Sequence, residues 1–143
     1  MAPFYGNYPC KIDDKGRFNI PARFRREFGV EGGESFVVTK GPDGCLLLYA
    51  PDGWKAFQEK LMNLPAGQEK KGTIRYYSSN SRLLTLDKQG RVGIPSEYLA
   101  KYGIKKEAVL VGLLDHIEVW NPTDFELSLS GAEEMVRKME HLL

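Results

Sequence analysis

The sequence predicts an α+β fold, rich in β-strands, in which two related units of about 70 residues share one chain of 143 residues. The first observation is a repeat, since DDKGRFNIPARFRREFG begins at Asp13 and LDKQGRVGIPSEYLAKYG begins at Leu86. The second is that short apolar runs alternate with glycine turns, as in hairpins. The third is that each unit ends in a stretch with apolar residues at helical spacing. Two copies are too few for a solenoid, so we expect a pseudo-twofold pair, equivalent to a dimer fused into one chain.

The two copies align through their first halves at an offset of 74 residues. The matched pairs include Ile12 with Leu86, Asp13 with Asp87, Gly16 with Gly90, Arg17 with Arg91, Ile20 with Ile94, Pro21 with Pro95, Phe24 with Tyr98, Phe28 with Tyr102 and Gly29 with Gly103. Further along, LYAP (48–51) matches VWNP (119–122) at an offset of 71. The second copy has therefore lost three residues between its strands. Both copies should contain the same elements in the same order.

Each copy begins with a short strand that enters an Asp-x-x-x-Arg turn, and a second short strand leaves it. The glycine before the arginine can adopt the positive φ that a tight turn requires. Pro21 and Pro95 stand where a short helix would begin, and Gly29 and Gly103 stand where it would end. Two aromatic residues at i and i+4 inside each predicted helix should face the core together.

A hairpin and a closing helix complete each copy. The first hairpin, ESFVVTKGPDGCLLLYA, is expected to turn at GPDG, and the second, EAVLVGLLDHIEVWN, is expected to turn near Asp115 and His116. The closing helix of the first copy lies within PDGWKAFQEKLMNL. Its apolar stripe consists of Trp54, Phe57, Leu61 and Leu64.

The second copy is expected to end in two helices. Thr123 or Asp124 should cap the first, and Gly131 should separate it from a tail helix. The tail helix carries an apolar stripe of Ala132, Met135, Val136, Met139 and Leu142. The polar stretch PAGQEKKG, residues 65–72, is the expected linker. The chain is thus divided into units 1–66 and 67–143.

Positive charge is concentrated in the two repeated segments, although the net charge of the chain is only +1. Residues 1–30 contain six Lys and Arg against three Asp and Glu, and residues 70–106 contain nine against two. The remainder of the chain is therefore acidic. This asymmetry favours one face that meets a polyanion, and the alternative is a solvated surface with a local bias in charge.

Few features of the sequence support an enzyme. It has no GxGxxG, P-loop or HExxH motif. A pair of adjacent carboxylates, Asp13 and Asp14, occurs in the first copy only. A catalytic pair of carboxylates would not require the turn to be repeated in the second copy. No apolar run has the length of a membrane span or of a signal peptide, which predicts an intracellular soluble protein.

The cysteines and histidines do not form a metal-binding pattern. Cys10 and Cys45 are far apart in the sequence, so we expect two reduced structural thiols. Only His116 and His141 could join them in a metal site. The sequence therefore predicts neither a metal nor a cofactor.

Binding of a polyanion through the two turns is the stronger prediction. Each turn projects an arginine with a lysine nearby, Lys15 beside Arg17 and Lys88 beside Arg91. An arginine on such a turn can reach a phosphate or donate two hydrogen bonds to guanine. The aspartate four residues earlier could orient the guanidinium or brace the turn. The alternative is that Asp and Arg simply pair within the fold.

The doubled motif, IDDKGRFNIP in the first copy and LDKQGRVGIP in the second, resembles the MraZ family of bacterial proteins over essentially the whole chain. The resemblance implies an AbrB-like, swapped-hairpin DNA-binding fold, in which two halves interlock into one small β-barrel with flanking helices. It also implies a transcriptional regulator of the division and cell-wall gene cluster, located in the cytoplasm on the nucleoid. Such proteins assemble into rings and bind repeated promoter boxes in double-stranded DNA.

The expected DNA-binding residues combine the motif positions with the neighbouring lysines. They are Asp13, Lys15, Arg17, Asp87, Lys88 and Arg91. No membrane and no small-molecule substrate is expected. The apolar tail, from Met135 to Leu143, makes either the ring contact or part of its own core. Two alternatives stay open. The chain could be a protein–protein interaction module whose basic turns bind an acidic partner, or an antitoxin-type relative of the same fold.

Overall fold

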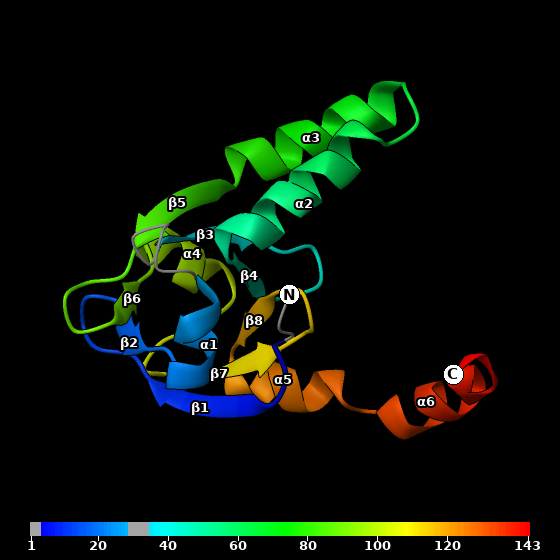
Figure 1. The fold of residues 1–143 in the computed structure, drawn as a ribbon. Coiled ribbons are helices and arrows are strands. Elements are labelled where there is room, and N and C mark those ends of the chain that lie inside the picture. The colour runs from blue at the N-terminus through cyan, green and yellow to red at the C-terminus, as the bar shows by residue number, and fades with distance from the viewer. Residues whose placement is uncertain (1–3, 29–34) are drawn as a thin grey trace.

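The computed structural model describes residues 4–28 and 35–143, whose elements are arranged as Figure 1 shows. The first copy contains β1 (Asn7–Lys11), β2 (Arg17–Asn19), α1 (Ala22–Arg25), the 3-10 helix η1 (Arg26–Phe28), β3 (Ser35–Lys40), β4 (Leu46–Tyr49) and α2 (Pro51–Met62). The remainder contains α3 (Gln68–Ser79), β5 (Ser81–Thr85), β6 (Arg91–Gly93), α4 (Ser96–Lys101), β7 (Glu107–Gly112), β8 (Ile117–Trp120), α5 (Pro122–Ser128), α6 (Ala132–Met139) and the 3-10 helix η2 (Glu140–Leu142).

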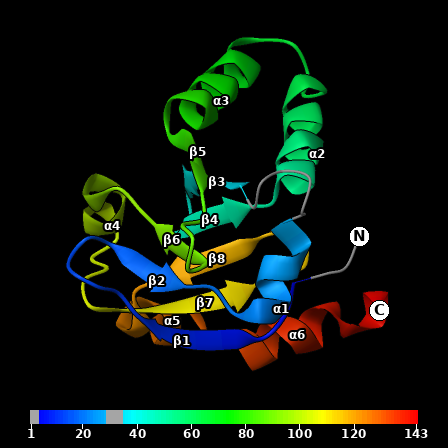
Figure 2. The same ribbon diagram turned by 60° about the vertical axis from the view of Figure 1, so that its left-hand side comes forward.

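Strands of the two copies pair with each other. Six strands form one antiparallel sheet in the order β1-β7-β8-β4-β3-β5, and β2 and β6 form a two-stranded ribbon. The β3–β4 and β7–β8 hairpins each belong to one copy, whereas the β1–β7, β3–β5, β4–β8 and β2–β6 ladders join the copies. Exchanging every strand for its counterpart reverses the sheet order. A pseudo-twofold axis therefore passes between β4 and β8, the neighbouring central strands in Figure 2.

The predicted α+β fold with two repeats is confirmed, but a closed barrel is not observed. Within residues 4–28 and 35–143, the ladders form an open sheet and a separate ribbon, and none of them joins the two into a cylinder. The ribbon is attached to the sheet through side chains instead. Phe18 and Val92, the central residues of β2 and β6, are buried in the same cluster as Leu48 and Leu110 of the sheet.

The main core is assembled from both copies. The matched pairs of the repeat supply it symmetrically, since Ile20 and Ile94 are both buried, as are Phe24 and Tyr98. The Phe24 ring also meets Phe4 and Tyr8 edge to face, with centroid distances of 5.4 and 5.1 Å. A second apolar cluster lies under α2 and α5 and includes Tyr49, Trp120 and Phe125. No helix in the described part of the chain has the length and apolar character that a membrane span requires.

The turns and helix ends largely follow the sequence predictions. Gly103 ends the helix region after α4 with a φ of 65°, as predicted. Both hairpin turns lie at the predicted positions, between β3 and β4 and between β7 and β8. The predicted helix end at Gly29 lies outside the described residues, and so does the side chain of Phe28.

The predicted linker at 65–72 is wrong over most of its length. Helix α3 begins at Gln68, so only residues 63–67 connect it to α2. The segment is polar but rich in good helix formers, and its helix is fixed by contacts further along. The Phe57 and Tyr77 rings meet edge to face at 4.9 Å, and the Tyr76 hydroxyl donates a hydrogen bond to the Lys40 carbonyl oxygen at 2.9 Å. The proposed unit boundary after residue 66 lies in this short connection.

The predicted caps of α5 are also wrong. The capping residue is Asn121, whose side-chain oxygen accepts hydrogen bonds from the backbone N–H groups of Thr123 and Asp124 at 2.8 and 3.4 Å. Pro122 then occupies the first helical position, which suits proline because that N–H has no partner inside the helix. Gly131, with a φ of 77°, separates α5 from α6 as predicted.

The tail helix does not close the core of its own chain. Met135, Val136, Met139 and Leu142, which we call the tail stripe, are 56–67% exposed. Helix α6 extends away from the sheet in Figure 1. The alternative in which this helix completes its own core is therefore not what the single chain shows.

Candidate nucleic-acid interface

In the first Asp-x-x-x-Arg turn, one carboxylate organises the backbone. Asp13 Oδ1 accepts hydrogen bonds from the N–H groups of Lys15 and Arg17, both at 2.9 Å. Asp13 Oδ2 accepts a third hydrogen bond from Arg17 Nε at 2.8 Å. Gly16 supplies the positive φ, 77°, that the turn requires. The side chain of Asp13 therefore fixes both the turn and the direction of the arginine.

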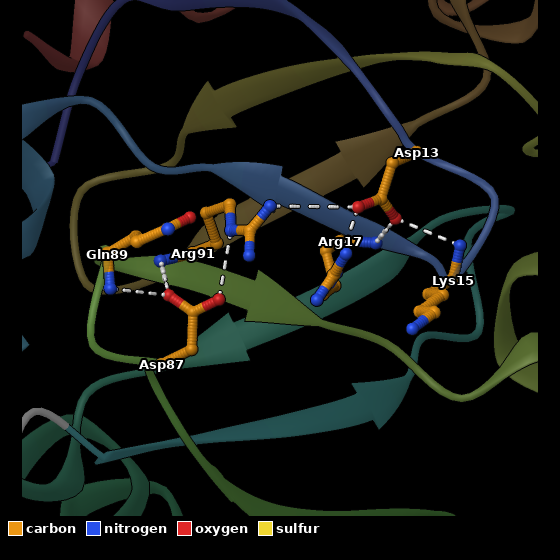
Figure 3. A network of polar contacts seen from close by, with 6 residues as sticks. All are labelled: Asp13, Lys15, Arg17, Asp87, Gln89 and Arg91. Carbon is orange, nitrogen blue, oxygen red and sulfur yellow. Dashed lines mark hydrogen bonds and ion pairs between the residues drawn. The ribbon is translucent and has the colours of Figure 1, made fainter.

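The second turn repeats this geometry, as Figure 3 shows. Asp87 Oδ1 accepts hydrogen bonds from the N–H groups of Gln89 and Arg91 at 2.9 and 2.8 Å, and Oδ2 accepts one from Arg91 Nε at 2.9 Å. Gly90 has the same φ of 77° as its counterpart. The sequence repeat is thus a repeat of three-dimensional structure.

The arginines lie on the outer face of the ribbon between the two turns. Arg17 pairs with Gly93 across the ladder, and Asn19 pairs with Arg91. Because strand residues alternate between faces, these four residues share one face, while Phe18 and Val92 point into the core. Asn19 is exposed. Sequence reasoning missed it, although its position two residues after Arg17 on a short strand was the available signal.

The two arginines use only part of their hydrogen-bonding capacity within the chain. Arg91 Nη1 lies 3.8 Å from Asp13 Oδ2, so the two turns are linked across the ribbon. Within the described residues, the terminal nitrogens of Arg17 have no hydrogen-bond or ion-pair partner. Asp and Arg therefore do pair within the fold, as the alternative predicted. The hydrogen bonds of these pairs use the Nε atom of each arginine and leave the terminal nitrogens of Arg17 available to a ligand.

The two lysines and the turn tips are exposed. Lys15 and Lys88 both lie at the solvent-facing ends of the turns, as does Asp14. In the alignment at offset 74, Lys88 matches Asp14 and Gln89 matches Lys15. The structure therefore places all six predicted residues on the two turns and the ribbon between them, but the lysines are not equivalent positions.

The surroundings of the two turns differ. An open groove of about 630 Å³ lies beside the first turn, between it and α4, with Leu99 in its lining. The counterpart of Leu99 is Arg25. Its guanidinium lies against Gly90 of the second turn, within 2.5 Å of the position that a Cβ would occupy there. Gly90 of the second turn thus packs against a guanidinium, whereas Gly16 of the first turn packs against the Leu99 side chain at the edge of an open groove.

This difference predicts unequal effects of Gly16→Ala and Gly90→Ala. A left-handed φ costs an alanine about 1–2 kcal/mol at either position. A Cβ at 16 would also lie 2.6 Å from the backbone oxygen of Ile94, which cannot move away easily, whereas at 90 it would meet the flexible Arg25 side chain. We expect Gly16→Ala to lower the free energy of unfolding more than Gly90→Ala does. Urea titration of both variants measures this, and equal losses would contradict it.

Hydrogen bonding to the two turn carboxylates lowers their pKa values. The Arg17 N–H is the main cause for Asp13, opposed by partial burial and supported by the Arg17 side chain and the Lys15 N–H. Arg91 and Gln89 act in the same way on Asp87. Both groups are therefore carboxylates throughout the physiological range and keep their arginines oriented.

The lowered pKa values predict how the turns respond to pH. A carboxylate with a lowered folded pKa contributes stability above its ordinary value of 3.8, and that contribution is lost as the pH falls through the folded value. We expect Asp13→Asn and Asp87→Asn to lower the melting temperature at pH 7, because asparagine keeps an acceptor for the N–H groups but loses the charge. The difference from the parent should shrink below pH 3.8. Melting curves measured from pH 7 down to acid test this, and a constant difference would contradict it.

Comparison with known proteins connects this geometry to a family of regulators. Residues 4–75 and 79–141 match the family described as "MraZ protein, putative antitoxin-like". The chain is similar to the Transcriptional regulator MraZ of Alkaliphilus metalliredigens, with 34% identity over 97% of this chain and 98% of that protein. It is also similar to the proteins of the same name from Lachnoclostridium phytofermentans and Moorella thermoacetica, with 41% and 40% identity over 86% of this chain and 84% of each relative.

Proposed function

The chain belongs to the MraZ family of transcriptional regulators, and we propose that it regulates transcription by binding double-stranded DNA through the β2–β6 ribbon and its two turns. The observation that carries the proposal is the pair Arg17 and Arg91, which Asp13 and Asp87 hold through their Nε atoms on one outer face of the ribbon. The proposed sites are repeated promoter boxes upstream of the division and cell-wall gene cluster, which the family resemblance suggested.

The shape of the ribbon suits the major groove. That groove is about 12 Å wide and admits a two-stranded β-ribbon. Each strand of the ribbon has three residues, or about 10 Å at 3.4 Å per residue. A ribbon of this size presents its arginines to base edges while the turns, with Lys15 and Lys88, reach phosphates on either side. Arginine in this position reads guanine through two parallel hydrogen bonds.

Assembly into a ring would explain how a chain of net charge +1 binds a polyanion tightly. One ribbon makes few contacts, but several ribbons on one ring engage tandem boxes at high effective concentration. The exposed tail stripe supports this part of the proposal, because a large apolar surface on a terminal helix requires a cover. A head-to-tail contact between neighbours closes into a ring when its rotation permits.

Arginine variants test the DNA-binding proposal. We expect Arg17→Ala and Arg91→Ala each to raise the Kd for duplex DNA from upstream of the chain's own gene by about 5- to 150-fold, since a good arginine–base pair contributes about 1–3 kcal/mol. Fluorescence anisotropy measures the affinity. Lys60→Ala on α2 is the matched control, because Lys60 is an exposed cation outside the ribbon and its turns.

Salt dependence separates base contacts from phosphate contacts. Lys15→Ala and Lys88→Ala should weaken binding to all sequences and reduce the slope of log K against log salt by about 0.9 for each lost phosphate contact. If both arginine variants bind DNA like the parent, the ribbon is not the DNA-binding face. If the parent itself shows no salt-dependent binding to any duplex, the basic turns serve another partner, such as an acidic protein.

A further inference from the structure

The outer face of the ribbon is not symmetric, although the backbone beneath it is. Arg17 stands across the ladder from Gly93, and Arg91 stands across from Asn19. Asn19 and Gly93 are counterparts in the repeat, so one arginine has an amide side chain as its neighbour and the other has bare backbone. A Cβ added to Gly93 would have one neighbour within 4 Å, Arg17 Cγ at 3.5 Å, which is an ordinary van der Waals distance. The glycine therefore leaves space on that half that a ligand can approach.

The turns at the two ends of the ribbon differ in charge as well. The first turn reads Asp-Asp-Lys-Gly-Arg and the second reads Asp-Lys-Gln-Gly-Arg. Asp14 and Lys88 thus occupy equivalent exposed tips with opposite charges. A phosphate is attracted to the tip at Lys88 and repelled from the tip at Asp14. On the first turn, the lysine is displaced by one residue to Lys15.

We infer that Asn19 is a specificity-determining residue of the ribbon, acting beside Arg91 in one half only. This inference rests on the proposed function. In the half that contains Arg91, the Asn19 amide can pair with adenine N6 and N7 beside the guanine read by the arginine. In the half that contains Arg17, Gly93 offers no side chain, so that half discriminates fewer bases.

Exchanging the differing exposed residues between the halves tests the inference. The triple variant Asp14→Lys, Lys15→Gln, Asn19→Gly gives both halves the second-copy surface. The triple variant Lys88→Asp, Gln89→Lys, Gly93→Asn gives both halves the first-copy surface. The four turn-tip residues and Asn19 are exposed, Gly93 is half-buried with room for a Cβ, and the core residues are unchanged. Circular dichroism and melting curves verify that the fold is retained.

The readout is the binding site that each full-length protein selects from a library of random DNA duplexes. We expect the parent to select a site whose two halves differ. Each triple variant should select an inverted repeat, the first variant without the adenine preference and the second with it in both halves. The single variant Asn19→Ala should lose about 5- to 150-fold discrimination at one base position. Asn63→Ala is its matched control, because Asn63 is an exposed asparagine after α2, outside the ribbon and its turns, and it should leave base discrimination unchanged.

The outcomes separate this inference from the proposed function. A parent that selects a palindromic site binds DNA as proposed but overturns the inference. Triple variants that keep the parent's asymmetric site also overturn it, because the exchanged residues would then not determine which bases each half selects. A parent that enriches no sequence overturns the proposed sequence-specific function itself. If a triple variant fails to fold, the site selected by the parent and the base discrimination of Asn19→Ala still test the inference.

Discussion

A fragment that contains residues 1–66 is expected to lose cooperative folding when it is separated from the rest of the chain. In the intact protein, β1 pairs only with β7 and β2 pairs only with β6 among the described strands, so both lose their partners in the fragment. Only the β3–β4 hairpin keeps an internal ladder. An isolated two-stranded hairpin is marginally stable in water. The remaining apolar surface, including Phe18 and Phe24, would be exposed.

Two copies of the fragment have a way to recover the fold. Because β5 and β7 are counterparts of β1 and β3, a second copy can supply a strand in place of each missing partner. At high concentration we therefore expect a homodimer with native-like sheet order, and at low concentration an unfolded chain. Sedimentation measures the mass, and dispersion of the amide resonances measures the fold. A well-dispersed spectrum from a monomeric fragment would contradict this and would favour two independent domains.

The second fragment provides the control. Mixing residues 1–66 with residues 67–143 should restore the spectrum of the intact chain, since the cut lies in the short connection between α2 and α3 and interrupts no ladder. Fragments that stay unfolded after mixing would indicate that strand pairing alone is not sufficient, and that folding also requires the covalent connection between α2 and α3.

The repeat determined how much of the fold was predictable. Paired motifs at fixed offsets located the turns, the short strands that follow them and both hairpins, because glycine, proline and apolar alternation act locally. They did not show that β2 and β6 pair with each other. Helix α3 was missed because its segment is polar, and its stability depends on partners distant in sequence, such as Phe57 and Lys40. The capping role of Asn121 was also missed, because Thr123 and Asp124 are equally good caps when only local sequence is considered.

The candidate site was predictable in residue type but not in arrangement. The doubled arginine and aspartate locate both turns from the sequence alone. The sequence did not show that Arg91 reaches Asp13 of the other copy, because that contact depends on the β2–β6 ladder. It did not single out Asn19 either. The spacing of two residues from Arg17 places Asn19 on the same face of the strand, but its position beside Arg91 depends on the β2–β6 ladder. The differences between the two turns are visible in the sequence, but the ladder was needed to show that Asn19 lies beside Arg91 and Gly93 beside Arg17.

The double variant Val136→Glu, Met139→Glu is expected to dissociate the proposed ring without unfolding the chain. Both side chains are more than half exposed in the single chain, at 59% and 56%, so the core gives no reason for a lower melting temperature. In the proposed ring the tail stripe is covered by a neighbour. Two buried carboxylates without partners would then strongly oppose that contact. The variant Arg137→Gln, Lys138→Gln is the matched control, because it makes the same change of two in net charge on the same helix and keeps the tail stripe.

DNA affinity should fall together with the assembly, although Arg17 and Arg91 are untouched. Linked sites gain about 10²- to 10⁴-fold in avidity over a single site, and a dissociated chain loses that gain. The loss should therefore be large on tandem boxes and small on a single box, which distinguishes it from damage to the ribbon. Light scattering measures the mass, calorimetry the stability and anisotropy the affinity. An unchanged mass would exclude the tail stripe as the contact between chains, and a collapsed melting transition would place α6 in the core of its own chain.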